Sequence, residues 1–147
     1  MAINYFDDKA VNPPRPRQIL VLQFCYPGLP PWEFNPNARI DKFEKNTAKN
    51  LFQDDIRVLI LEQKSDRKYD GEMVENPVVS IKWGLPDKRR RDWDNLVAMS
   101  KPLIDSLVHL GVIKDDTVRH YQPRYSWVDS PKNPFTEIKV YRREYDN

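Results

Sequence analysis

The sequence predicts one small domain of mixed α/β (α+β) type, with a mixed sheet and two main helices in the order β-α-β-α-β-β. Short apolar runs of strand length alternate with two longer segments of helical spacing. The 147 residues are 39% hydrophobic and 12% aromatic, which is enough for one core but makes a second domain unexpected. The only cysteine, Cys25, excludes an intrachain disulfide, so the fold has to depend on that core.

The first strand is expected after a flexible N-terminal leader. Residues 1–17 contain three prolines among mixed charges, which is typical of a leader, so the folded domain is expected to span 18–147. Residues 18–26, QILVLQFCY, form a nearly continuous apolar run that ends at PGLPP. This run predicts a strand buried on both faces or on most of one. Residues 27–37 are expected to form a loop.

The first helix is predicted between Ile40 and Gln63, where apolar residues recur every three or four positions. The residues at this spacing are Ile40, Phe43, Ala48, Leu51, Phe52, Ile56, Leu59 and Ile60. Residues 64–76 are polar and include Asp-Gly, so they are expected to form a turn-rich connection.

The second strand and the second helix follow this connection. Residues 77–85, PVVSIKWGL, are rich in β-branched side chains and predict a strand. A helix is predicted over residues 94–110, where apolar side chains recur at helical spacing until Gly111. Pro102 removes one backbone N–H and disfavours helical angles at Lys101, so a kink or an interrupted turn is expected there.

Two more strands are predicted in the last third of the chain. Residues 112–128 pass through a turn at Asp115 and Asp116 into one strand. Residues 135–144, FTEIKVYRRE, alternate between apolar and polar side chains, as a second strand would.

Composition limits the classes of partner and the compartment. The 24 Lys and Arg barely exceed the 22 Asp and Glu, so the net charge of +2 does not by itself demand a polyanionic partner. No stretch approaches the roughly 18 apolar residues that cross a bilayer, and the N-terminus has no apolar signal segment. These features predict a protein of a reducing cytoplasm, neither secreted nor bound to a membrane.

The densest charge cluster is KRRRDWDNL, residues 88–96. Asp92 and Asp94 lie two positions apart at a strand-to-helix junction, where an extended backbone points both side chains to the same side. Asp115 and Asp116 follow the second helix, from where the chain could return to the same end of the sheet. We therefore expect three or four carboxylates to converge on Mg²⁺, or on Mn²⁺ in its place, with a phosphodiester completing the coordination shell.

The neighbouring cations fit the same chemistry. Four of them, Lys88, Arg89, Arg90 and Arg91, would reduce the repulsion between close carboxylates and attract a phosphate backbone. Lys101 comes seven residues after Asp94 and could lie two turns along the same face. There it could neutralise a phosphate or a leaving group.

Simpler explanations stay open at this point. Asp94 could be the N-cap of the second helix, and Asp115 and Asp116 could be turn formers. Lys101 could be an ordinary exposed lysine, and Asp105 an ordinary aspartate on the helix surface.

Other polar and aromatic side chains carry less weight. The two histidines, His109 and His120, have no partner at metal-ligand spacing and are expected to be structural or exposed. Five aromatic residues could stack on bases but are expected in the core or an interface: Trp83, Trp93, Tyr121, Tyr125 and Trp127.

The segment RRRDWDNL, followed by KPLIDSLVHLGVIKDD, resembles the RusA family of Holliday-junction resolvases, small endonucleases common in phages and prophages. The family pattern is Asp-x-Asp-Asn-Leu at the start of a helix, a lysine, Asp-x-Leu, a glycine, and an Asp-Asp pair before a strand. The matching residues are Asp92, Asp94, Asn95, Leu96, Lys101, Asp105, Leu107, Gly111, Asp115 and Asp116. The resemblance covers residues 86–120, with a looser similarity in the N-terminal half.

This resemblance implies a homodimeric, Mg²⁺-dependent nuclease of mixed α/β fold. Carried over by motif, Asp92, Asp94 and Asp116 would bind metal and Lys101 would be the catalytic lysine. In shorter members the lysine follows the second aspartate by four residues, where this chain has Ala98. Counted back from Asp116, Lys101 falls into register, which indicates a three-residue insertion.

The sequence therefore predicts an endonuclease that resolves four-way junctions and other branched DNA by paired nicks, in recombination, repair or phage DNA processing. It would act in a bacterial cytoplasm or a phage-infected cell, as a dimer with one site per subunit. Asp115 would help to hold the metal, and the cations of residues 88–91 would follow the DNA backbone.

Two other functions remain open at this stage. One is a module that holds branched or single-stranded DNA without cutting it, although a pure binder would gain from losing acidic groups near phosphate. The other is a sugar-nucleotide transferase with Asp92-Trp93-Asp94 as its metal motif. The transferase is less favoured, because the chain has only four glycines and no glycine-rich turn after its first strand.

Overall fold

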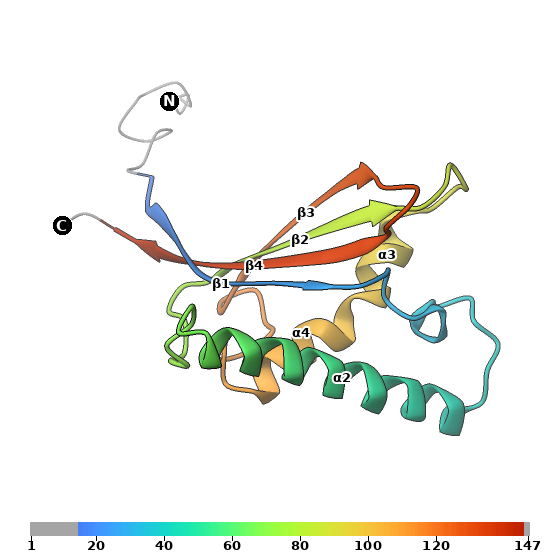
Figure 1. Ribbon diagram of the computed structural model, residues 1–147, viewed down its shortest axis with the longest axis horizontal. Coiled ribbons are helices and arrows are strands. Elements are labelled where there is room, and N and C mark those ends of the chain that lie inside the picture. Colours follow the sequence, from blue (N-terminus) through green and yellow to red (C-terminus); the bar gives the residue numbers. More distant parts are fainter. Residues whose placement is uncertain (1–14, 146–147) are drawn as a thin grey trace, which may run out of the picture.

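Four strands and their covering helices make up most of residues 15–145, the part of the chain that this computed structural model describes (Figure 1). The elements are β1 (Arg17–Tyr26), η1 (Trp32–Phe34), α2 (Lys42–Ser65), β2 (Val78–Leu85), α3 (Trp93–Met99), α4 (Lys101–His109), β3 (Gln122–Asp129) and β4 (Phe135–Glu144). The predicted β-α-β-α-β-β order is confirmed, with the second helix divided into α3 and α4.

The strands form one mixed sheet in the order β1-β4-β2-β3. β4 pairs antiparallel with both β1 and β2, whereas β2 and β3 are parallel, with Val78 opposite Gln122 and Leu85 opposite Asp129. A parallel pair needs a crossover, because the chain leaving one end of the first strand must return to the other end. α3 and α4 provide that crossover.

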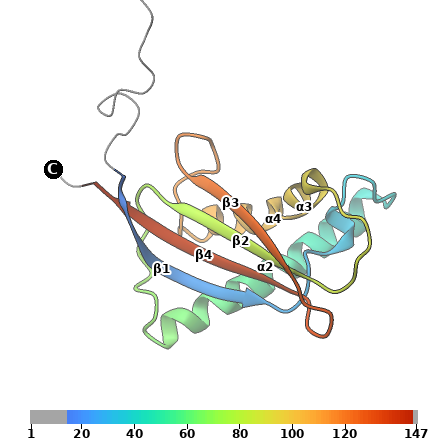
Figure 2. The same cartoon turned by 90° about the horizontal axis from the view of Figure 1, so that it is seen from above.

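The helices cover one face of the sheet, and the strands lie side by side above them (Figures 1 and 2). The core lies between these two layers. Its fully buried members include Leu22, Phe52, Ile56, Ile81, Trp83, Leu103, Leu107 and Ile138. β1 is an edge strand that buries only Leu22 and Phe24, so it is covered on one face, and Cys25 is exposed.

α2 begins two residues later than the apolar spacing indicated, because Asp41 is its N-cap. The carboxylate of Asp41 accepts a hydrogen bond from the backbone N–H of Glu44 at 2.7 Å, which satisfies one of the free donors of the first turn. Phe52, Ile56 and Ile60 bury the face that packs on the sheet. No helix in residues 15–145 combines the length and the apolar character needed to cross a membrane.

The expected interruption near Pro102 is confirmed. α3 ends at Met99, and Pro102 lies in the first turn of α4. N–H groups of the first turn have no carbonyl partner within the helix, so a proline there removes no helical hydrogen bond. The hydroxyl of Ser100, between the two helices, donates to the carbonyl oxygen of Leu96 at 2.9 Å. α4 ends before Gly111, whose φ of +74° lies in the left-handed region that favours glycine.

The leader predicted over residues 1–17 lies mostly outside the described residues. Its last residue, Arg17, is instead the first residue of β1, and its guanidinium pairs with Glu144 of β4 at 2.8 Å.

We expect Gly84→Ala to destabilise the protein by about 1–3 kcal/mol, because a Cβ at this position would overlap the ring of Phe135 on the neighbouring strand. Chemical denaturation of single and double variants measures this. The same change should have little effect in a Phe135→Ala background, and an equal loss in both backgrounds would contradict the steric explanation.

Candidate functional site

Asp92 and Asp94, the first acidic pair, lie where the loop after β2 enters α3. Asp92 is the N-cap with φ −86° and ψ 141°, yet its carboxylate makes no hydrogen bond to the helix N–H groups. α3 begins at Trp93, so Asp94 is in the first turn and does not cap the helix. The expectation of an extended backbone through both aspartates is therefore wrong. The contact of Asp92 Oδ1 with Arg90 Nε is long, at 3.4 Å, so the carboxylate remains open to a ligand.

Trp93, between the two aspartates, attaches the start of α3 to the core. Its ring packs edge-to-face on Trp83, with ring centroids 6.0 Å apart and an interplanar angle of 61°. Trp83 is fully buried in β2 and stacks on Tyr125 of β3, with centroids 5.5 Å apart. The sheet thus fixes where the first acidic pair stands. Trp93 itself and Trp127 are half-exposed.

The basic loop, residues 88–91, divides into two kinds of side chain. Lys88, Arg89 and Arg90 are exposed. Arg91 is only 16% exposed, and its guanidinium donates to Asp87 Oδ1 at 2.9 Å and to the Asp87 carbonyl oxygen at 3.2 Å. The hydrogen bond from Arg91 holds the pKa of Asp87 below its ordinary value. Arg91 therefore fastens the loop, and its position does not favour the DNA contact predicted for it.

The ammonium group of Lys101 joins α4 to the loop that follows it, and Asp105 extends these contacts to α2. Nζ donates to Asp116 Oδ2 at 2.9 Å and to Asp105 Oδ1 at 3.1 Å, and the other oxygen of Asp105 lies 3.8 Å from Lys49 Nζ. The hydrogen bond to Asp116, followed by that to Asp105, raises the pKa of Lys101, and the same contact lowers the pKa of Asp116. Asp105 is thus part of a charge network from α2 to the loop after α4, rather than an isolated surface aspartate.

Asp115 and Asp116, the second acidic pair, lie in the loop between α4 and β3. Asp115 Oδ1 accepts the N–H of the next residue, Asp116, at 2.8 Å, and Oδ2 lies 3.9 Å from His120 Nδ1. His120 also contacts the hydroxyl of Thr117. Burial, and then the negative charge of Asp116, raise the pKa of Tyr121. These neighbours of His120 were not predicted from the sequence, because the geometry of the loop brings them together.

The two acidic pairs adjoin opposite ends of the parallel strand pair β2 and β3. The first follows Leu85 at the end of β2, whereas the second precedes Gln122, which pairs with Val78 at the beginning of β2. The expectation that the chain returns to the same end of the sheet is therefore wrong. Within residues 15–145 no three His, Cys, Asp or Glu side chains are grouped closely enough to hold a metal ion. Metal binding at these four aspartates stays a prediction.

No protein-family model matches this chain, and the curated proteins contain no match to it.

The ion pair of Lys101 and Asp116 should respond to pH in a defined direction. Because the folded-state pKa of Asp116 is lowered, the pair should stabilise the fold above about pH 4, and this contribution should disappear as the pH falls through the folded-state pKa. Carboxyl NMR titration should place the pKa of Asp116 below the ordinary aspartate value, and Lys101→Met should return it toward that value. Lys114→Met, at an exposed lysine on the same loop, is the control and should leave the titration unchanged. A titration of Asp116 that Lys101→Met does not move would contradict the pairing.

Proposed function

We propose that this protein is a Mg²⁺-dependent endonuclease that cuts branched DNA, with the four-way junction as its substrate. The observation that carries the proposal is the first acidic pair, whose carboxylates are open to a ligand directly beside three exposed cations of the basic loop. Acidic groups that hold a hard cation and basic groups that hold a phosphate backbone are both needed at a phosphodiester-cutting site. The motif resemblance to RusA resolvases points in the same direction.

The donor set suits a hard cation, since Asp92 and Asp94 offer carboxylate oxygens that no helix cap consumes. A contribution from Asp115 or Asp116 would require the loop after α4 to approach the first acidic pair, and would require Asp116 to share or leave its bond to Lys101. Bound there, Mg²⁺ would lower the pKa of a water molecule for attack on the phosphodiester and would stabilise the leaving oxygen.

Lys101 would act on the phosphate through its charge. Its raised pKa keeps the ammonium protonated throughout the neutral range, and its contact with Asp116 places that charge next to the second acidic pair. A positive charge at this place would offset the negative charge that develops on the phosphoryl oxygens.

A second candidate is a module that binds branched DNA without cutting it. Two observations favour it. Asp116 is already paired with Lys101, and the second acidic pair leads into the opposite end of the sheet from the first. Under this alternative the basic loop would bind phosphate, and the aspartates would serve the loops that they stabilise.

A homodimer fits the proposed substrate, because a four-way junction is roughly two-fold symmetric and its resolution needs two incisions. The solvent face of α2 offers a surface for it. Phe43, Leu51, Val58 and Leu61 are all exposed there, on the face opposite the buried Phe52, Ile56 and Ile60. These four side chains form an apolar stripe, with the exposed polar Thr47 and Asp54 between them, and an exposed apolar patch is typical of a protein contact. We propose that a second copy of this chain covers it.

Replacing either member of the first acidic pair should separate cutting from binding. We expect Asp92→Asn and Asp94→Asn each to reduce cleavage of a labelled four-way junction by about 100-fold or more, since each removes a negative metal ligand. Junction affinity in Ca²⁺ should stay within a few fold, and chelation of Mg²⁺ should abolish cleavage by the wild type. Gel analysis with linear duplex as a control measures both quantities. Tight junction binding by the wild type without nicks in Mg²⁺ or Mn²⁺ would favour the binding module instead.

The dimer surface has its own test. Leu51→Lys should shift the protein toward the monomer in sedimentation equilibrium, because it places a charge in the middle of the apolar stripe. Asn46→Lys adds the same charge at an exposed polar position of α2 and should leave the association unchanged. A dimer that withstands Leu51→Lys would place the contact elsewhere.

A further inference from the structure

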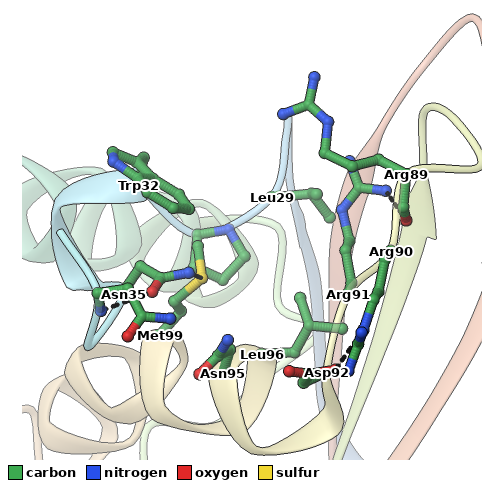
Figure 3. A pocket seen from close by; sticks show the side chains of 12 residues that line it. Leu29, Trp32, Asn35, Arg89, Arg90, Arg91, Asp92, Asn95, Leu96 and Met99 are labelled. Carbon is green, nitrogen blue, oxygen red and sulfur yellow. Dashed lines mark hydrogen bonds and ion pairs between the residues drawn. The ribbon is translucent and has the colours of Figure 1, made fainter.

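A pocket of about 450 Å³ opens beside Asp92, between the loop after β1 and the start of α3 (Figure 3). Its floor is apolar and comes from two segments far apart in the sequence: Leu29 and Pro30 from the loop, and Leu96 and Met99 from α3. The volume and the apolar lining are those of a site for a small planar ligand. Because Asp92 belongs to the wall, the pocket is continuous with the first acidic pair.

Trp32 forms one side of this pocket, opposite the arginines of the basic loop (Figure 3). Its side chain is 61% exposed, and no aromatic ring or guanidinium of residues 15–145 stacks on it. An exposed indole at the mouth of an apolar pocket can serve as a stacking platform for a nucleobase.

The polar groups of the pocket match the edge of a base. Asn35 is only 7% exposed, and within the described residues its amide nitrogen has a single partner, the thioether sulfur of Met99 at 3.5 Å. A thioether is a weak acceptor, so a buried amide donor is left poorly satisfied. Asn95 points into the same space from α3 (Figure 3). Asn35 Oδ1 already accepts the backbone N–H of Asn37 at 2.8 Å, so Asn35 offers a base mainly its amide N–H donor, whereas the amide of Asn95 offers a donor and an acceptor.

The rim supplies the charge for the phosphates on either side of such a base. The guanidinium of Arg89 makes no ion pair to residues 15–145, and that of Arg90 is 90% exposed. Both can meet phosphates of a strand that passes over the mouth. Because the cations continue along the basic loop rather than ending at a single point, the rim fits a continuing strand better than a free nucleotide.

We propose that this pocket takes up one unstacked base of the bound DNA strand, stacked on Trp32 and contacted by Asn35, beside the phosphate that the first acidic pair addresses. The inference rests on the proposed function in its choice of branched DNA as the ligand, but it does not need cleavage. At a junction, bases next to the branch point are already partly unstacked, which lowers the free energy needed to move one into a pocket. Such a base would give the protein a preference for the nucleotide next to the cut.

The first experiment places 2-aminopurine, a fluorescent adenine analogue, at each position around the branch point of a four-way junction. Binding is followed in Ca²⁺, without cleavage, for wild type, Trp32→Ala and Trp127→Ala. Trp127 is 50% exposed and does not line the pocket, so it is the matched control. We expect quenching at one position with wild type and Trp127→Ala, lost with Trp32→Ala, whose junction affinity should fall about tenfold. An abasic site at that position should weaken wild type about tenfold and leave Trp32→Ala unchanged.

Several outcomes would overturn the inference. The first is that quenching does not depend on the position of 2-aminopurine. The second is that Trp32→Ala and Trp127→Ala have equal effects. The third is that the abasic site weakens binding by wild type and by Trp32→Ala equally. Displacement of the junction by free dAMP at micromolar concentration would instead identify a site for a free nucleotide. A changed oligomeric state of Trp32→Ala would identify a protein contact.

The outcome for this pocket is distinguishable from that for the nuclease. If the protein takes up the base but makes no nicks in Mg²⁺, the pocket proposal is supported and the nuclease proposal fails. If Trp32→Ala cleaves the junction at an unchanged rate and with an unchanged nucleotide preference, the nuclease proposal is supported and the pocket proposal fails. If wild type binds no branched DNA in Ca²⁺, both proposals fail. Thermal unfolding is the control for folding. If Trp32→Ala unfolds at the same temperature as wild type, a loss of quenching is not caused by a loss of the fold.

Discussion

The contact of Trp93 with Trp83 is the constraint on which the candidate site depends. Trp83 lies fully buried in the middle of the sheet, and the indole N–H has no hydrogen-bond partner among the described residues, so packing alone positions it. Trp93 rests on this fixed ring at the first residue of α3. Asp92 and Asp94 flank Trp93, so the carboxylates of the first acidic pair are held at the edge of the sheet while remaining exposed.

The charged side chains near the contact of Trp93 with Trp83 have different roles, although they are of the same few types. Arg91 and Asp87 satisfy one another and shape the basic loop, whereas Arg89 and Arg90 stay exposed at the mouth of a pocket. Lys101 and Asp116 form a link between α4 and the following loop. Charged residues of similar type thus become a structural pair, an open cationic rim and an ion-pair network, because burial and distance differ for each side chain.

Local chemistry was enough to predict most of the elements. Helical spacing, β-branched runs, and the positions of Gly111 and Pro102 act over a few residues, and each determined an element or a break that the structure contains. Two of the errors were also local in origin. Asp41 caps α2, so the helix begins later than the apolar spacing indicated. Asp92 rather than Asp94 is the N-cap of α3, so the backbone is already helical at Trp93. An extended backbone at Trp93 would have been needed to point both carboxylates to the same side.

By itself, the sequence determined the order of the elements, the single core and the residue types of the candidate site. Tertiary structure alone decided which of those residues meet. The parallel pairing of β2 with β3 sends the chain after Asp116 into the opposite end of the sheet from the first acidic pair, and no local signal in the sequence specifies that pairing. The pocket of Trp32 and Asn35 likewise depends on a loop and a helix about 60 residues apart in sequence, brought together only by the shared core.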